Sequence, residues 1–293
     1  MLIATLIAAD RLSAGDISLA KDILAESGAS ISEDRWIEAE KAADIRFSGD
    51  LSAARSALAT ITDPIDVIIQ DEINRAKKLF VADMDSTMIT VECLDELADY
   101  AGFKDQVSAI TERAMQGELD FVAALDERVA LLADMDADVV SRCHEERVRI
   151  SEGTQTLVRT MKAHGTTNVL VSGGFTLFAD RVALEIGFDR AVANTLAIAD
   201  GRLTGRVDRP IIDGTAKLQI LNEETVRLGL DPAETMAIGD GANDLAMVER
   251  SGLGVAYRGK PKLRDAADAR IDHGDLTALL YAQGYARADW VEA

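Results

Sequence analysis

The sequence predicts an α/β protein in which a doubly wound parallel sheet carries an inserted helical cap and follows a small N-terminal α+β domain. From about residue 76 the chain repeats apolar strand, turn and helix, the pattern of a parallel sheet with helices on both faces. Before residue 72, short strands and helices follow an order compatible with a ferredoxin-like βαββαβ layer. We therefore expect two domains, at 1–72 and 76–293, with the cap at about 89–150.

The N-terminal segment has strand and helix patterns but no chemical motif. A polar segment at 71–78 follows it and is expected to link the two domains. Apolar patterning predicts strands at 2–9, 42–47 and 65–70, a further strand around 36–40, and helices at 17–27 and 51–61.

The strand predicted before residue 83 ends in two carboxylates one residue apart, Asp83 and Asp85. Because side chains alternate along an extended chain, both carboxylates would lie on one side of it. Such a pair is unfavourable unless one member is protonated or a cation lies between them, and a hard ion such as Mg²⁺ fits oxygen ligands better than zinc does. Taken alone, Asp-x-Asp is also a common turn sequence. The other motifs favour the catalytic interpretation.

Two later strands also end in polar turns. A strand at 169–172 ends at Ser172 and precedes two glycines, and a strand at 235–239 precedes Asp240. Helical patterns follow these turns at 175–186 and 245–250. Ligands of parallel sheets gather at the carboxyl ends of the strands. We therefore expect these strand ends and Asp83 to form one crevice.

Between residues 89 and 149 helical periodicity replaces the strand pattern, which predicts a lid over the crevice. Phe121 and Arg128 are seven residues apart and share a helix face. Arg128 borders an apolar stripe, so its guanidinium either reaches out to water or grips a carboxylate. Lys217, near the start of a later helix, is equally compatible with a solvated surface lysine. The candidate cap helices are 92–101, 104–115, 119–133 and 136–147.

Composition excludes several classes of function. The formal net charge of −20, without a local basic stripe, argues against nucleic acid as a partner. No apolar run approaches the roughly 18 residues of a membrane span, so no membrane association is expected. The two cysteines are far apart and lack metal-type spacing, which is typical of a protein in a reducing cytoplasm.

Together these residues resemble the four motifs of the haloacid dehalogenase superfamily, and more narrowly the phosphoserine phosphatase family, over roughly residues 76–283. The first motif is Asp-x-Asp-Ser-Thr at 83–87, followed by Ser172, Lys217 and Gly-Asp-Gly-x-Asn-Asp at 239–244. The cap contains the matching segments Val-Glu-Cys-Leu-Asp-Glu at 91–96, Ala-Met-Gln-Gly-Glu-Leu-Asp-Phe at 114–121 and Arg-Val-Ala-Leu-Leu at 128–132.

The resemblance implies hydrolysis of O-phospho-L-serine to L-serine and phosphate, the final step of serine biosynthesis. Asp83 would be the nucleophile and Asp85 the general acid and base. Mg²⁺ would be held by Asp83, the Asp85 backbone carbonyl and Asp240, with Asp244 orienting the shell. The implied substrate-binding residues are Glu92, Met115, Gly117, Phe121, Arg128, Ser172, Gly173, Lys217 and Asn243.

The N-terminal segment resembles the ACT-like regulatory domain attached to some phosphoserine phosphatases. Effector binding, a homodimer formed through this domain, and structural support are all compatible with that order of elements. Two other activities stay open as well. A related phosphotransferase would pass the phosphoryl group to another small hydroxyl compound, and an amino-acid sensor would have lost catalysis. The intact set of Asp83, Asp85 and Asp240 argues against a sensor.

Overall fold

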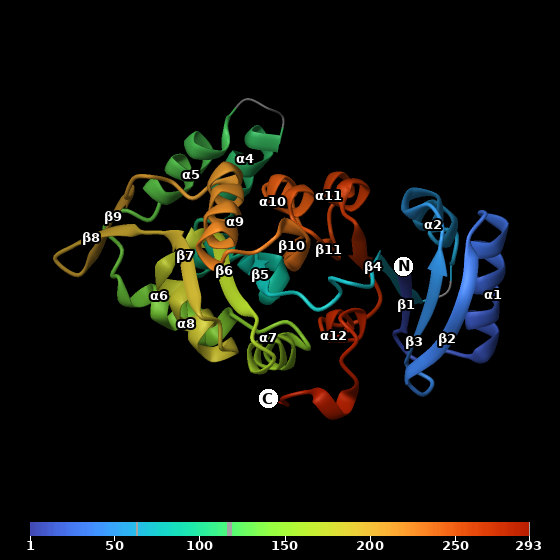
Figure 1. The fold of residues 1–293 in the computed structure, drawn as a ribbon. Helices are drawn as coiled ribbons and strands as arrows, with labels where there is room; N and C mark the ends of the chain where they lie inside the picture. The colour runs from blue at the N-terminus through green and yellow to red at the C-terminus, as the bar shows by residue number, and fades with distance from the viewer. Residues whose placement is uncertain (63, 116–118, 293) are drawn as a thin grey trace.

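Three mostly buried strands and one exposed edge strand form an antiparallel sheet at the N-terminus, covered on one face by two helices (Figure 1). The structure, a computed structural model, describes residues 1–62, 64–115 and 119–292. The strands pair in the order β2-β3-β1-β4, and side chains such as Leu24 and Phe47 form a separate core between sheet and helices. The elements are β1 (Leu2–Ala8), α1 (Ala14–Glu26), β2 (Ser30–Glu38), β3 (Ala42–Ser48), α2 (Leu51–Leu58) and β4 (Ile65–Asp71).

The remainder of the chain is organised around a six-stranded parallel sheet in the order β12-β11-β10-β5-β6-β7. Its central strands β5 and β10 are buried along their whole length, as expected for a sheet covered on both faces. This arrangement confirms the predicted fold class. The strands are β5 (Leu79–Ala82), β6 (Thr167–Phe175), β7 (Arg190–Asn194), β10 (Thr235–Gly239), β11 (Gly254–Tyr257) and β12 (Ala269–Ile271).

Helices cover both faces of this sheet. One core contains apolar side chains of α7, α8 and α12, and a second, on the other face, contains those of α9, α10 and α11. Short helical turns lie at Met84–Met88, Pro232–Glu234 and Arg287–Asp289. The helices are α7 (Thr154–Ala163), α8 (Thr176–Ile186), α9 (Gly214–Leu228), α10 (Leu245–Arg250), α11 (Pro261–Ala266) and α12 (Ala278–Ala282).

A helical cap is inserted after β5, and the chain leaves and re-enters the sheet domain at one place. Ile89 and Ile150 form an antiparallel bridge, and the amide of Thr90 donates to the carbonyl of Arg149 at 2.9 Å. A β-hairpin from the sheet domain packs against α5 of the cap. The cap helices are α3 (Cys93–Tyr100), α4 (Lys104–Met115), α5 (Phe121–Ala130) and α6 (Asp138–Arg147), and the hairpin strands are β8 (Leu196–Ala199) and β9 (Arg202–Val207).

The open face of the N-terminal sheet packs on α12 of the sheet domain, around a buried charge. Asp44 is 1% exposed and accepts hydrogen bonds from Thr5 at 2.8 Å and from both terminal nitrogens of Arg75 at 2.8 and 2.9 Å. Arg75 also donates to the carbonyls of Tyr281 and Ala282 in α12, at 3.2 and 3.1 Å. One arginine therefore ties both parts of the molecule together.

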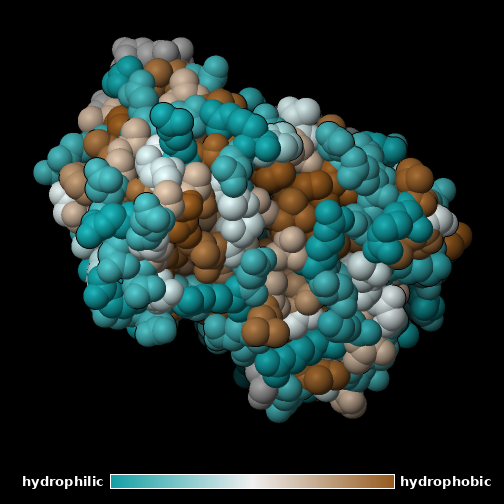
Figure 2. All heavy atoms as spheres, turned by 90° about the vertical axis from the view of Figure 1, so that its left-hand side faces the viewer, coloured by the Kyte–Doolittle hydropathy of each residue, from teal (hydrophilic) through white to brown (hydrophobic). Residues whose placement is uncertain are grey.

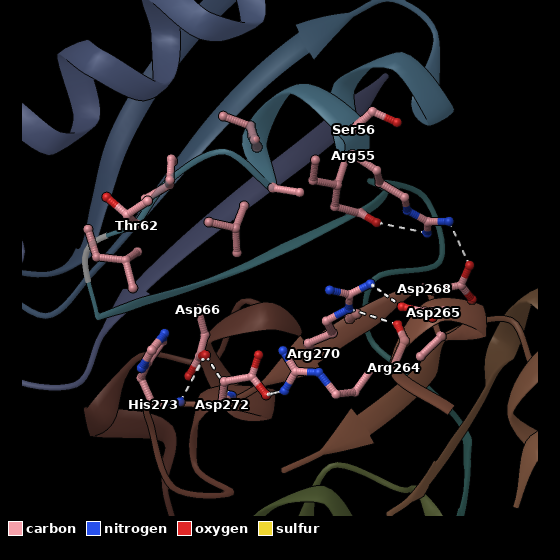
Figure 3. Close-up of a pocket in the computed structure, with 18 of the residues that line it drawn as sticks. Arg55, Ser56, Thr62, Asp66, Arg264, Asp265, Asp268, Arg270, Asp272 and His273 are labelled. Atoms are coloured by element: carbon pink, nitrogen blue, oxygen red, sulfur yellow. Dashed lines mark hydrogen bonds and ion pairs between the residues drawn. The ribbon is translucent and has the colours of Figure 1, made fainter. Parts of the chain in front are cut away.

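A second part of this junction is a cleft of about 650 Å³ between α2 and β4 on one side and α11 and β12 on the other (Figure 3). Its charged side chains contact one another. Arg55 pairs with Asp268 at 2.6 Å, and Arg264 pairs with Asp272. Asp66 accepts hydrogen bonds from three successive amides beginning at Asp272, at 2.8 to 3.2 Å. These contacts connect the two domains across the cleft.

Three expectations differ from the structure. The strand expected around residues 36–40 is β2, which begins six residues earlier; it is an edge strand whose charged side chains face solvent, so it lacks the apolar alternation that reveals a strand. The expected helix at 119–133 is shorter, at Phe121–Ala130. The strand expected at 169–172 is longer, at Thr167–Phe175, so Ser172 lies within it. The segment at 71–78, expected to link the two domains, runs from the end of β4 to β5; it is partly buried, because Arg75 is bonded to both sides of the junction and Lys77 is 4% exposed.

Figure 2 shows that hydrophilic side chains dominate one face of the molecule, where apolar side chains reach the surface in small patches. Among the described residues, the helices are too short or too polar for any of them to cross a bilayer.

Candidate active site

Three neighbouring strands, in the order β10-β5-β6, bring polar residues to one edge of the parallel sheet. Asp83 follows β5, Ser172 lies in the last part of β6, and Asp240 follows β10. The amide of Asp83 donates to the carbonyl of Ile238 at 3.0 Å, so the ladder extends one residue past β5 and fixes the carboxylate at the sheet edge. The three strand ends expected to form a crevice therefore lie side by side.

Lys217 lies beneath this edge, between two carboxylates. It is in the first turn of α9, which begins after Asp213, whose side chain accepts a hydrogen bond from the amide of Ala216 at 2.8 Å. The fully buried Nζ of Lys217 donates to Asp83 Oδ1 at 2.5 Å and to Asp244 Oδ1 at 2.7 Å. Burial acts to lower the pKa of Lys217, but the two carboxylates outweigh it and raise that pKa. Lys217 is therefore a fixed cation rather than a solvated lysine.

The loop after β10 folds tightly around Asp244. Its Oδ2 accepts the amides of Asp240 at 3.2 Å and Gly241 at 3.1 Å. A Cβ atom at Gly239 would lie 2.3 Å from the carboxyl group of Asp244, so only glycine fits there. The spacing of glycines and acids in this motif thus follows from the close approach of the Asp244 carboxylate to the backbone.

Asp85 is held away from Asp83 by its own hydrogen bonds. Its Oδ1 accepts the amide of Cys93 at 2.9 Å, and its Oδ2 accepts the hydroxyl of Ser172 at 3.2 Å. Burial, and then the charge of Glu92, raise the pKa of Asp85 to about 6, while the bonds from Cys93 and Ser172 oppose the shift. A carboxyl with a pKa near neutrality is suited to giving and taking protons.

Carboxylate oxygens of Asp83, Asp240 and Asp244 lie within 4.8 Å of one another, and all three residues are buried. Burial and the charge of Asp244 raise the pKa of Asp83 well above its ordinary value, although Lys217 opposes this. A cation among these oxygens would remove the mutual repulsion, and hard divalent ions prefer such ligands. The residues fit a Mg²⁺ ion.

The cap closes the crevice into a pocket of about 110 Å³. The ring of Phe121 lies over the end of β6, close to Gly173. A Cβ atom added at Gly173 would lie 3.2 Å from that ring. Glu92 and Arg128 both line the pocket, so opposite charges face one space. Glu92 accepts the Ser86 hydroxyl at 2.7 Å. The lining residues are Asp83, Asp85, Glu92, Leu94, Phe121, Leu125, Arg128, Gly173, Gly174, Phe175, Asp240, Asn243 and Lys260.

Most residues expected at the site come together here, in two layers. Ser172, Lys217 and Asp244 are fully buried behind the pocket wall and bond to residues that line it. Gly117 and the side chain of Met115 lie outside the described residues.

Two further residues at the site were not expected from the sequence. Asn194, 1% exposed at the end of β7, donates to the carbonyl of Gly173 at 2.9 Å and accepts the amide of Ile212 at 2.7 Å, which fixes the loop before α9 against the β6 end. Lys260 reaches Asp240 Oδ2 at 3.3 Å from the start of α11. No local motif marks either residue, because both act through contacts between distant segments.

The sequence profile of the haloacid dehalogenase-like hydrolases matches residues 80–249, which include the Asp83, Ser172, Lys217 and Asp240 segments. The chain belongs to this family. Two relatives are phosphoserine phosphatases. That of Archaeoglobus fulgidus is 45% identical over 217 residues, covering 73% of this chain and 63% of the relative; that of Streptomyces coelicolor is 42% identical over 279 residues, covering 92% and 67%.

A solved structure also supports membership of the haloacid dehalogenase-like family. A phospho-aspartyl intermediate analogue of phosphoserine phosphatase superimposes with a TM-score of 0.65 at 37% identity, covering 70% of this chain and 98% of that one. The resemblance inferred from the motifs is thereby confirmed. The chain spans about two thirds of the length of the two sequence relatives described above.

Proposed function

We propose that this protein is a phosphoserine phosphatase that hydrolyses O-phospho-L-serine to L-serine and phosphate, as in the final step of serine biosynthesis. The observation that carries the proposal is the pocket itself: an aspartate pair at the sheet edge, with Asp83 buried and Asp85 half-buried, faces a cap that presents one acid, Glu92, and one base, Arg128. Relatives of that name at 42–45% identity support it.

In the first step Asp83 attacks phosphorus, the bond between phosphorus and the serine oxygen breaks, and an aspartyl-phosphate forms on Asp83. Asp85 donates its proton to the departing serine oxygen. In the second step Asp85 takes a proton from the water that attacks the aspartyl-phosphate, which releases phosphate, frees the Asp83 carboxylate and returns Asp85 to its protonated form. The raised pKa of Asp85, about 6, supports this double role.

The phosphoryl oxygens would be bound by the Ser172 hydroxyl, the Gly173 amide and Lys217, with Asn243 supporting them. Lys217 is already charged and fixed by two carboxylates, so it needs no rearrangement to offset charge in the transition state. Mg²⁺ would be held by the carboxylates of Asp83 and Asp240 and by the backbone carbonyl of Asp85, with Asp244 orienting them. When bound, the ion would neutralise charge on the phosphoryl group.

Substrate selection would come from the cap. Arg128 would bind the substrate carboxylate and Glu92 its ammonium group, while Phe121 would exclude water, a role also expected of Met115. Arg128 donates Nε to the carbonyl of Ala124 in its own helix at 3.1 Å, which holds the guanidinium against the cap. A zwitterion satisfies both charges at once, and a ligand lacking either group leaves one of them unpaired.

Phosphate release from O-phospho-L-serine, measured with Mg²⁺ and with EDTA, tests the proposal. Phosphothreonine, phosphoethanolamine and phosphoglycolate serve as comparison substrates. Metal-dependent preference for phosphoserine is expected. Preference for another ester would keep the chemistry and overturn the substrate, release that depends on an added hydroxyl acceptor would indicate a phosphotransferase, and serine binding without turnover would indicate a sensor.

We also propose that the N-terminal domain, an ACT-like module, forms a homodimer or binds an effector, and that the protein works in the cytoplasm. The free edge of β2 supports a dimer contact, because both faces of its sheet are covered within the chain. The free thiols of Cys93 and Cys143 support a reducing compartment. Light scattering with and without L-serine tests assembly: a monomer that does not respond to serine would remove both proposed roles of the domain.

A further inference from the structure

Lys260 places an exposed ammonium group at the mouth of the catalytic pocket. Its side chain is 62% exposed, and its Nζ lies 3.3 Å from Asp240 Oδ2. A Cβ atom at Gly241 would lie 3.8 Å from the same nitrogen, so the side chain passes over the loop that follows β10. Lys260 is therefore a cation between the sheet side and the cap side of the pocket.

The backbone of Lys260 is anchored more firmly than its side chain. Its amide donates to the carbonyl of Asp240 at 2.7 Å, and its own carbonyl accepts the amides of Leu263 and Arg264 at 3.0 Å, as the N-cap of α11. Pro261 follows as the first helical residue. The Cα atom is thus fixed beside Asp240, while the four-carbon side chain stays free to reach a ligand at the mouth.

The electrostatics of the pocket require such a cation. Asp83, Asp85, Glu92 and Asp240 line a small space in a protein of formal net charge −20. A phosphomonoester dianion that also carries a carboxylate would be repelled on approach. Of the other two cations, Lys217 is fully buried behind the wall, and Arg128 is held against the cap.

We propose that Lys260 is a substrate-recruiting residue, which attracts the anionic phosphomonoester to the pocket mouth and contacts it there. This inference rests on the proposed phosphatase function. It predicts that Lys260 acts mainly on kcat/KM through the capture of substrate, because the bonds that form and break lie deeper, at Asp83. It also predicts a strong dependence on ionic strength, since the side chain is exposed to screening salt.

An alternative role is purely structural: Lys260 would only hold Asp240 in place. An exposed ion pair of this kind contributes little to the stability of a protein. The two roles differ in what they change. Recruitment alters the salt dependence of kcat/KM, whereas support of Asp240 alters the affinity for Mg²⁺ and kcat.

The test compares Lys260→Gln and Lys260→Arg with the wild type and with Lys262→Gln. Lys262 is exposed two residues further on, in α11, and does not line the pocket. Its replacement by glutamine removes the same charge as Lys260→Gln, so it is a matched control. At low salt we expect Lys260→Gln to lose about tenfold in kcat/KM for phosphoserine with kcat nearly unchanged. The loss should shrink to about twofold at 0.5 M NaCl. Lys260→Arg should retain most activity, and Lys262→Gln should match the wild type.

Calorimetric titration of phosphoserine into Asp83→Asn, with and without Lys260→Gln, measures capture without turnover; weaker binding in the double variant is expected. A salt profile of Lys260→Gln parallel to that of the wild type, or a loss of Mg²⁺ affinity with unchanged phosphoserine binding, would overturn the proposal. An inactive wild type would instead refute the phosphatase function, so the two failures are distinguishable.

Discussion

Two regions of the molecule bury carboxylates beside cationic side chains: the crevice at the ends of β5, β6 and β10, and the junction between the N-terminal sheet and α12. In the junction, Asp44 is surrounded by donors, with Arg75 at 2.8 Å and Arg35 at 3.2 Å. In the crevice, Asp83 and Asp244 share Lys217, Asp240 pairs with the exposed Lys260, and Asp85 accepts only hydrogen bonds from uncharged donors.

The difference between these regions separates structure from function. Charge at Asp44 is fully compensated by hydrogen-bonded partners, so the junction has no need of a further ligand. The crevice keeps an excess of negative charge whose cost is relieved only by a bound cation or by protonation. Uncompensated buried charge is therefore the better marker of an active site than buried charge alone.

Replacing Asp83 with Asn should break the crevice's function without breaking its fold. The change is nearly isosteric, removes the proposed nucleophile and lessens the repulsion with Asp244, so phosphate release should fall by at least about 10⁴-fold while thermal stability is kept or increased. Steady-state assays and thermal melting measure the two effects, with the exposed Asp10→Asn as control. Substantial remaining turnover would refute the covalent mechanism.

Lys217→Met should show how far the crevice depends on its buried cation. Without the ammonium group, Asp83 and Asp244 face each other uncompensated, and the free energy of unfolding should drop by about 3–5 kcal/mol in EDTA. Mg²⁺ should restore part of the loss, because the ion occupies the same negative field. Urea unfolding with EDTA and with Mg²⁺ checks this, beside the exposed Lys262→Met. An equal loss under both conditions would argue against a metal among these carboxylates.

Asp44→Asn tests the opposite expectation for the junction. The amide keeps the shape but leaves Arg75 without its anion, so we expect a loss of about 3 kcal/mol in stability with kcat unchanged. Glu33→Gln removes a carboxylate from an exposed pair with Arg46 and should cost less than about 1 kcal/mol. Equal losses in the free energy of unfolding for the two variants would show that burial does not determine how much the Asp44–Arg75 pair stabilises the protein.

Lys77 offers the smallest and most specific test, because burial lowers its pKa to about 8. Between pH 8 and pH 10 the unfolded chain, with the ordinary lysine pKa, binds more protons than the folded one, so this residue makes stability rise with pH. The stability of wild type relative to Lys77→Met should therefore increase by on the order of 2 kcal/mol over that range. Urea unfolding at each pH measures it. The free energy of unfolding of Lys78→Met, a variant at an exposed neighbour, should follow the same pH dependence as that of the wild type. If the difference in free energy of unfolding between the wild type and Lys77→Met does not change with pH, burial does not destabilise the charged form of Lys77.

Sequence reasoning worked best where local pattern and chemistry coincide. The predicted segments 235–239 and 245–250 match β10 and α10 residue for residue, because a mostly apolar, fully buried strand and a short helix flank a glycine-rich acidic turn. Asp83 and Asp240 could be placed together since parallel strands deliver their ends to one edge.

It failed where a role arises only from tertiary contact. Asn194 and Lys260 have no motif of their own and gain their place from the loops that fold against them. Arg75 reads as part of a polar linker, yet it is 11% exposed and bonded to Asp44. Burial of this kind depends on which surfaces meet, and that information is spread over distant segments of the chain.

The chain enters the cap at Ile89 and leaves it at Ile150, and the bridge between these two residues bears on how enzymes with such a cap can diversify. Because the cap departs and returns through adjacent hydrogen-bonded residues, with Ser151 donating to the carbonyl of Met88 at 3.0 Å, its length is decoupled from the sheet. A cap of another size could replace this one between the same two points without moving the aspartates at the sheet edge. The residues at the sheet edge and the cap residues that select the substrate can then evolve separately.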